Sequence, residues 1–168
     1  MTIKRSFGPV ADQRTRVLVL GSLPGERSLE ERRYYAHPRN QFWRLIGAVV
    51  DLDLAALPYE HRLEALLASG VGLWDSVGSA TRSGSLDTAI RGASANPLRA
   101  LTDRLPHLRA VGFNGGTSAA IGGKALAGAS VALLPLPSSS PAYTLSFDDK
   151  LGRWLALRPF LDSCAVPA

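Results

Sequence analysis

The 168-residue sequence predicts an α/β fold, a three-layer α/β/α sandwich with a central, mainly parallel sheet of about four strands. Two observations predict this architecture. Four short, nearly continuous apolar runs are typical of strands that are buried on both faces. Between these runs lie stretches in which apolar residues recur at helical spacing. Strands that alternate with helices in this way favour a parallel sheet covered on both sides.

The candidate strands are distributed along most of the chain. The first run ends in glycine, and prolines end the last one, as expected where a strand gives way to a turn. The four runs are residues 16–21 (RVLVLG), 70–77 (GVGLWDSV), 108–115 (LRAVGFNG) and 130–137 (SVALLPLP).

The first long helix is predicted at residues 39–50, where apolar side chains recur at helical spacing. Pro38 suits the first helical position, because a proline there loses no hydrogen bond. Asn96 followed by Pro97 indicates a second helix start of the same kind.

Two further helix starts are predicted from capping boxes, in which a serine is followed three residues later by an acidic side chain. These pairs are Ser28 with Glu31 and Ser146 with Asp149. A small-residue helix and turn are expected around residues 114–128. The last helix is expected at about residues 148–159.

Composition and length indicate a globular protein. With 46% hydrophobic and 20% charged residues, the chain is expected to form one globular domain, residues 1–168. A single cysteine, Cys164, excludes a disulfide framework and an iron–sulfur cluster held by cysteines of this chain. Residues 1–16 lack the apolar core of a signal peptide, and no apolar run would span a bilayer. We therefore expect no membrane partner and a cytoplasmic location, at the nucleoid in a bacterium.

The net charge of +5 mildly favours a polyanionic partner, and the fold indicates where that partner would bind. In sheets of this kind, ligands lie beyond the carboxyl ends of the strands. GSLPG (21–25) lacks both the P-loop and the dinucleotide-binding spacing, so it is either a plain turn or a loop whose N–H groups face a ligand. The other strand ends are WDSV (74–77), FNGG (113–116) and LPSSSPAY (136–143). The hydroxyl groups of the last stretch suit phosphate oxygens, although a surface turn is the alternative.

The stretch YYAHPRNQFW (34–43) mixes aromatic, polar and basic side chains. Asn40 is expected in the first helical turn, where its amide can hold a water or an anionic group. Tyr34 and Tyr35 can stack on a flat ring, whereas Phe42 and Trp43 are expected in the core.

Other polar residues leave alternatives open. His37 is a helix cap, a phosphate contact or a catalytic acid, and Arg39 is solvent-facing or binds phosphate. Asp75 and Asp87 are the acidic residues nearest the expected cleft, and GSLDTAI (84–90) is expected to be a helix entry capped by Ser85. No two of the three histidines stand at metal-ligand spacing, and G-x-S-x-G is absent, so neither a metal site nor a nucleophile elbow is predicted.

Taken in order, GSLPG, SLEERRYYAHPRNQFWRLIG, GLWDSV, GSLDTAI, FNGG and LPSSSPA resemble the uracil-DNA glycosylase superfamily, and most closely its hypoxanthine-DNA (deoxyinosine) glycosylase branch. The resemblance covers about residues 7–154. It implies an α/β/α sandwich that needs no metal and no organic cofactor. It also implies base excision repair of DNA containing a deaminated base, by base flipping and hydrolysis of the N-glycosidic bond.

Two departures from the wider superfamily decide which residue is catalytic. The position that carries the water-activating Asp or Asn in other branches is Leu23, and the position of a histidine that assists the leaving base is Leu136. The hypoxanthine branch resembles this chain at both positions and has its catalytic asparagine in the HPRN segment. The resemblance therefore assigns the positioning of the attacking water to Asn40.

The resemblance also implies the remainder of the site. The base-binding pocket would be formed by Gly21, Ser22, Leu23, Pro24, Gly25, Tyr34, Tyr35, His37, Asp75 and Asn114. DNA would be bound by Arg39, Ser138, Ser139, Ser140, Pro141 and Tyr143, with the loop through Tyr143 pressing into the vacated base stack.

The leading hypothesis is a monofunctional DNA glycosylase, acting as a monomer on deoxyinosine and also on deoxyuridine. No lysine nucleophile stands in the motifs, which argues against lyase chemistry. The alternatives are a uracil-preferring DNA glycosylase, a non-catalytic DNA-binding module on the same scaffold, and a hydrolase of free nucleosides or nucleotides.

Overall fold

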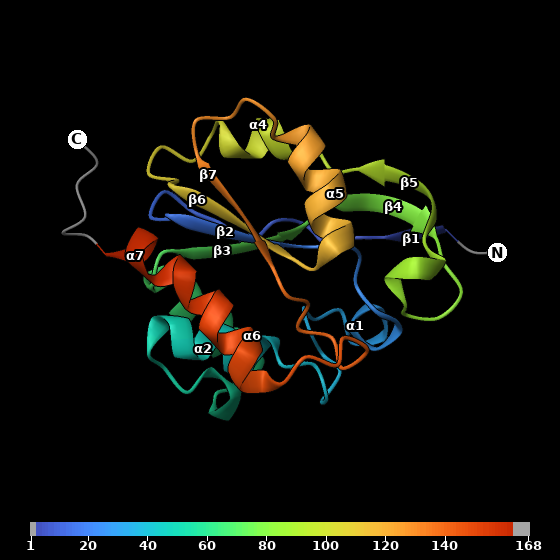
Figure 1. The fold of residues 1–168 in the computed structure, drawn as a ribbon, viewed down its shortest axis with the longest axis horizontal. Helices are drawn as coiled ribbons and strands as arrows, with labels where there is room; N and C mark the ends of the chain where they lie inside the picture. The colour runs from blue at the N-terminus through green and yellow to red at the C-terminus, as the bar shows by residue number, and fades with distance from the viewer. Residues whose placement is uncertain (1–2, 163–168) are drawn as a thin grey trace.

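A four-stranded, wholly parallel sheet forms the centre of the protein, which confirms the predicted fold class (Figure 1). The computed structural model describes residues 3–162, so Cys164 lies outside the described residues. The strand order is β3-β2-β6-β7. The bounds are β2 Val17–Gly21, β3 Val71–Asp75, β6 Ala110–Asn114 and β7 Ala132–Leu136. Each strand falls within one of the four apolar runs.

Helices cover both faces of this sheet, and the side chains of β2 show why. Val17 and Val19 point into one hydrophobic core, and Leu18 and Leu20 point into the other. The first core is covered by α2 (Phe42–Val50), α3 (Tyr59–Ala68) and α6 (Phe147–Trp154), and the second by α4 (Leu98–Thr102) and α5 (Gly116–Ala125). Figure 1 shows α2 and α6 on one side of the sheet and α4 and α5 on the other.

A second, antiparallel sheet was not predicted. It has the order β1-β4-β5 and consists of β1 (Ile3–Arg5), β4 (Val77–Thr81) and β5 (Arg91–Ala95). The apolar run 70–77 is therefore not one strand, because it contains β3 and the start of β4. At the junction of β3 and β4, the N–H groups of Ser76 and Val77 donate to the carbonyls of Gly21 and Ser22. The chain passes from the first sheet to the second at this point.

The helix starts were predicted with mixed success. Helix α2 begins at Phe42, so neither Pro38 nor Asn40 is helical. The side chain of Asn40 instead accepts the N–H of Phe42, the first helical residue, at 2.9 Å. Ser28 lies inside α1 (Glu26–Glu31) and accepts the N–H of Ala36, so the capping box predicted there was wrong.

The other predicted starts are confirmed. The hydroxyl of Ser146 accepts the N–H of Asp149 at the start of α6, and Pro97 directly precedes α4. The predicted last helix is divided into α6, a 3₁₀ turn η3 (Leu155–Leu157) and α7 (Arg158–Leu161). A further 3₁₀ turn, η1, covers Leu54–Ala56. No helix of residues 3–162 is long and apolar enough to cross a membrane.

Two adjacent glycines in α5 give a matched test of how closely this helix packs. A methyl group at Gly122 would lie 2.5 Å from Cε1 of Phe113, whereas one at Gly123 would meet nothing within 4 Å. We expect Gly122→Ala to lower the free energy of unfolding by about 1–3 kcal/mol through overpacking. Gly123→Ala should raise it by about 0.5–1 kcal/mol, since alanine favours the helix. Urea unfolding measures both, and equal effects would contradict the described packing of α5.

Candidate active site

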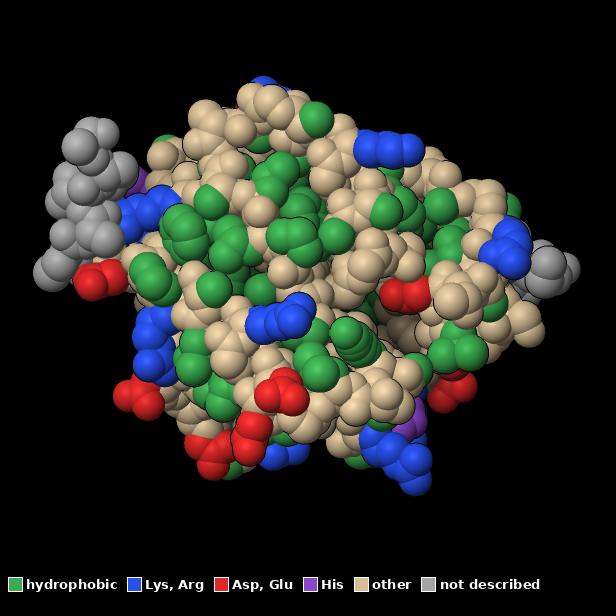
Figure 2. Space-filling model, in the orientation of Figure 1, with side chains coloured by type: hydrophobic (Ala, Val, Ile, Leu, Met, Phe, Trp, Pro, Cys, Tyr) green, Lys and Arg blue, Asp and Glu red, His purple; other side chains and the backbone are tan. Residues whose placement is uncertain are grey.

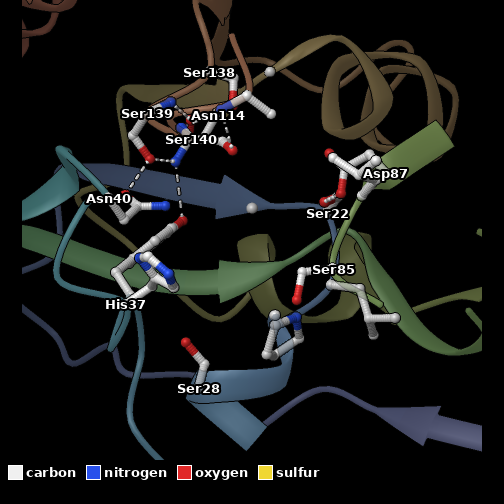
Figure 3. Close-up of a pocket in the computed structure, with 18 of the residues that line it drawn as sticks. Ser22, Ser28, His37, Asn40, Ser85, Asp87, Asn114, Ser138, Ser139 and Ser140 are labelled. Atoms are coloured by element: carbon white, nitrogen blue, oxygen red, sulfur yellow. Dashed lines mark hydrogen bonds between the residues drawn. The ribbon is translucent and has the colours of Figure 1, made fainter. Parts of the chain in front are cut away.

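A cavity of about 650 Å³ opens at the carboxyl ends of the parallel strands. Gly21 and Asp75 are paired in register at the ends of β2 and β3, and Asn114 and Leu136 at the ends of β6 and β7. The loops that follow these strands therefore converge, as the sheet topology requires. Figure 3 shows side chains from these loops around the same space.

The structure brings together nearly all the residues that were predicted for the site. Arg39 is exposed and does not line the cavity. The predicted residues that line it are Gly21, Ser22, Leu23, Pro24, Gly25, Tyr34, Tyr35, His37, Asn40, Asp75, Asn114, Ser138, Ser139, Ser140, Pro141 and Tyr143.

Ser139 joins Asn40 to Asn114. The hydroxyl of Ser139 accepts a hydrogen bond from Nδ2 of Asn114 at 2.9 Å and donates its own proton to Oδ1 of Asn40 at 2.7 Å (Figure 3). The N–H of Ser139 donates to Oδ1 of Asn114 at 2.8 Å. With a side chain only 1% exposed, Ser139 has an internal partner for both its hydroxyl and its N–H. This differs from the surface phosphate contact that was predicted for it.

These bonds fix the orientation of the Asn40 amide. Its Oδ1 accepts from Ser139 and from the N–H of Phe42, so both lone pairs of this oxygen are occupied. The amide nitrogen makes no hydrogen bond within residues 3–162, and Asn40 lines the cavity. Asn40 therefore presents a hydrogen-bond donor to the cavity and not an acceptor.

The two tyrosines have different environments. Tyr34 is 4% exposed, its ring meets Phe7 edge-on, and its hydroxyl donates to the carbonyl of Gly8. Tyr35 stacks on Phe42 with ring centroids 3.9 Å apart, and its hydroxyl accepts from Nδ2 of Asn114 at 3.3 Å. One face of the Tyr35 ring is thus already covered. Phe42 and Trp43 are buried in the core, as predicted.

Asp75 is a buried carboxyl with an unpartnered oxygen. Its side chain is 3% exposed, and Oδ2 has no hydrogen-bond partner in the described structure. Burial and the nearby Asp87 carboxyl raise the pKa of Asp75 to about 7, against the opposing charge of Arg82. Its Oδ1 lies 2.6 Å from the position that a Cβ of Gly21 would occupy, so a side chain at Gly21 would displace the carboxyl.

A second wall of the cavity was predicted only in part, because Asp87 was expected near the cleft but its neighbours were not. Between β4 and β5, the loop that contains η2 (Asp87–Ala89) contributes Ser85, Leu86, Asp87 and Thr88 to the lining. Ser22 donates to Asp87 at 2.6 Å, and Ser85 accepts the N–H of Glu26 at 2.9 Å. The available signal was the motif GSLDTAI, which was expected to be a helix entry capped by Ser85. That cap was wrong, because η2 starts at Asp87 with Leu86 at its N-cap and Ser85 bonds Glu26 instead.

The buried guanidinium of Arg82 holds the same wall in place. It donates to the carbonyls of Leu23, Pro24 and Gly84. It therefore joins the GSLPG turn to the loop after β4. Residues 3–162 contain no group of three or more His, Cys, Asp or Glu side chains placed to hold a metal ion.

Comparison with known proteins relates this geometry to a family. The model of the uracil DNA glycosylase superfamily matches residues 7–159. A relative from Methanosarcina barkeri (strain Fusaro), named hypoxanthine DNA glycosylase, is 45% identical over 112 residues, which are 67% of this chain and 71% of the relative. A relative of the same name from Methanosarcina acetivorans is 40% identical over 113 residues, or 67% and 72% of the two chains.

The fold matches a solved structure over nearly its whole length. A solution NMR structure from Methanosarcina acetivorans, solved as a candidate uracil DNA glycosylase, superposes with a TM-score of 0.86 at 34% identity. The match covers 96% of this chain and 100% of the other.

The raised pKa of Asp75 predicts a specific dependence of stability on pH. Because the folded carboxyl holds its proton more tightly than the unfolded one, whose pKa is about 4, stability should fall as the pH rises from about 4 to about 7. We expect Asp75→Asn to remove this loss and to raise the free energy of unfolding at pH 8 by up to about 4 kcal/mol. Urea unfolding across this pH range is the measurement. Asp53→Asn, at an exposed carboxyl, is the control, and equal profiles for the two variants would contradict the assignment.

Proposed function

Because the chain belongs to the uracil DNA glycosylase superfamily and is a DNA glycosylase, we propose that it releases hypoxanthine from deoxyinosine in DNA. Two relatives that bear this activity in their names support the choice of base. One observation on this chain supports the proposal most directly. The amide of Asn40 lines the cavity, and a hydrogen bond from Ser139 fixes its orientation. Leu23, which stands where other branches have the water-activating residue, lines the same cavity and has no polar group.

The target nucleotide would be flipped out of the duplex, since the bond to be cut is not accessible within the stack. A cavity of about 650 Å³ falls within the range of ligand-binding pockets. We assign the base to the space beside Asp75, Tyr35 and the GSLPG turn. The two donors and the amide oxygen of Asn114 bind Ser139 and Tyr35, so its assigned role is to hold the pocket together.

In the proposed mechanism Asn40 positions the attacking water through its N–H group. An amide donor holds the oxygen of a water but does not remove a proton from it. This suits a dissociative reaction, in which the bond to the base is largely broken and the sugar has oxocarbenium character before water attacks. Positioning the water then contributes more to the rate than basicity does. The base leaves with the electron pair of the N-glycosidic bond and takes up the proton that the water loses, so that neutral hypoxanthine and an abasic sugar are formed.

The loop after β7 would bind the DNA backbone. The hydroxyls of Ser138 and Ser140 accept the N–H groups of Ser140 and Ala142, so their own protons remain able to donate to phosphate oxygens. Tyr143, 41% exposed beside Pro141, is the assigned wedge. Arg39 and His37 are both on the exposed segment before α2. His37 would contact the DNA at the edge of the cavity, and Arg39 would contact the phosphate backbone outside it. We propose that the enzyme acts as a monomer.

Single-turnover assays test the activity and the role of Asn40 together. Labelled duplexes with one deoxyinosine, one deoxyuridine or no lesion are incubated with the protein, and alkali cuts any abasic site. We expect release at deoxyinosine and a loss of about 100-fold or more for Asn40→Ala. Asn40→Asp should lose as much, because it replaces the N–H donor with a second oxygen.

The outcomes of that assay are distinct. Release only at deoxyuridine would keep the mechanism and make uracil the substrate, which the NMR relative makes the second candidate. Full activity in Asn40→Asp would show that a donor is not what the reaction needs. No release from any duplex would contradict the proposed function.

Ser139 offers a second test, because it acts through Asn40. We expect Ser139→Ala to lower kcat by about 10- to 100-fold with little change in KM, since the amide of Asn40 loses its fixed orientation. Ser138→Ala is the matched control, because the Ser138 hydroxyl does not contact Asn40. That variant should mainly raise KM. The same kcat and KM for both variants would show that Ser139 does not orient Asn40.

A further inference from the structure

The loop after β7 lies above a buried cation that the proposed mechanism does not use. Lys150 is on α6, and its side chain is 1% exposed. Its Nζ donates to Oε1 of Gln41 at 2.9 Å and to the carbonyl of Ser140 at 3.2 Å. It lies 5.6 Å from the ring centroid of Tyr143, within the range of a cation–π contact.

No ion pair joins Lys150 to a carboxylate among the residues that the structure describes. The ion pairs found elsewhere include Lys4–Glu26, Arg14–Asp12, Arg27–Glu31 and Arg99–Asp103. Burial lowers the pKa of Lys150, whereas the two oxygen acceptors and the aromatic face favour its ammonium form. Buried charges are normally paired, so a buried ammonium with only neutral partners calls for a functional explanation.

The contacts of Lys150 also decide which groups the loop presents outward. The carbonyl of Ser140 receives both Nζ of Lys150 and the N–H of Tyr143, so this oxygen points inward. Four residues further along α6, Trp154 donates to the carbonyl of Pro137 at 2.9 Å and holds the start of the same loop. With these carbonyls directed away from solvent, the loop presents the Ser138 and Ser140 hydroxyls, which suits an anion.

The surface itself carries no concentrated positive charge on the face that Figure 2 shows, where Lys and Arg side chains are scattered singly. An exposed lysine is screened by salt, whereas a buried charge is screened much less. A buried ammonium beneath a loop that faces DNA therefore attracts a phosphate across the loop.

We propose that Lys150 is the counter-charge of a DNA phosphodiester bound on the loop of residues 138–143. It acts as a positioning residue, because its ammonium reaches the phosphate electrostatically and not by direct contact. The proposal rests on the assignment of this loop to the DNA backbone. It identifies Lys150 as the residue whose charge contributes to the binding energy of the phosphate at this loop.

Three variants test it. Lys150→Gln keeps a hydrogen-bond donor but removes the charge. Gln41→Glu keeps the lysine and places a carboxylate beside Nζ, so that the charge is neutralised inside the protein. Lys124→Gln is the control, because it removes the same charge from an exposed position in the last turn of α5.

Binding is measured with a duplex that carries 2′-fluoro-deoxyinosine, whose fluorine resists formation of the sugar cation, over a series of salt concentrations. We expect Lys150→Gln and Gln41→Glu each to weaken binding by about tenfold at low salt. The slope of log affinity against log salt should become shallower by up to about 0.9. Lys124→Gln should change affinity by less than about threefold.

Methylphosphonate substitution, which removes the charge of one DNA phosphate, then identifies the phosphate that interacts with Lys150. Neutralising one phosphate near the lesion should weaken binding by the wild-type protein about tenfold and by Lys150→Gln less than about twofold, because the coupled charge is already absent. Thermal unfolding reports whether each variant is folded.

A folded Lys150→Gln with unchanged salt slope and unchanged methylphosphonate effects would show that the lysine only supports the loop. If Lys150→Gln does not fold, Gln41→Glu decides the question, and unchanged DNA binding by that variant overturns the proposal. If the wild-type protein binds DNA with a Lys150-dependent slope but releases no base, the proposed function fails and the assignment of Lys150 stands.

Discussion

The hydroxyl of Ser139 is the point at which three distant parts of the chain are joined. It accepts from Asn114 at the end of β6 and donates to Asn40 before α2, while its own N–H returns to Asn114. Because the Oδ1 of each asparagine and the Nδ2 of Asn114 have defined partners, neither amide can rotate without breaking these hydrogen bonds, which is costly. The direction in which Asn40 faces the cavity, and hence the kind of chemistry it can perform, depends on this one side chain.

The rest of the cavity is organised around the same strand ends. Asp75 can stand beside β2 only because Gly21 has no side chain, and Arg82 ties the GSLPG turn to the loop after β4. Unlike the Ser139 group, Asp75 has an oxygen with no partner in the described structure. The cavity thus combines a hydrogen-bonded group that fixes the Asn40 amide with a buried carboxyl oxygen that has no partner in the described structure.

Sequence reasoning recovered the parallel sheet because its four strands are apolar on both faces, and it recovered most of the cavity because strand ends must meet at one edge. It missed the second sheet, since β5 is exposed and has no apolar pattern. It placed Asn40 inside the helix, because Pro38 is a good first residue and the turn before Phe42 leaves no periodic signal. The role of Ser139 depends on contacts about a hundred residues apart in the chain, which local patterns do not report.

The distance of 99 residues between Asn40 and Ser139 also bears on the order in which the parts of this site are assembled. Asn40 is synthesised early, but the residue that orients it follows β7, the last strand of the central sheet. A chain still emerging from the ribosome, or one cut before β7, has the amide without its support. Contacts between segments so far apart in sequence form late in folding, because a long loop must first be closed. The orientation of the Asn40 amide is therefore fixed only after β7 has joined the central sheet.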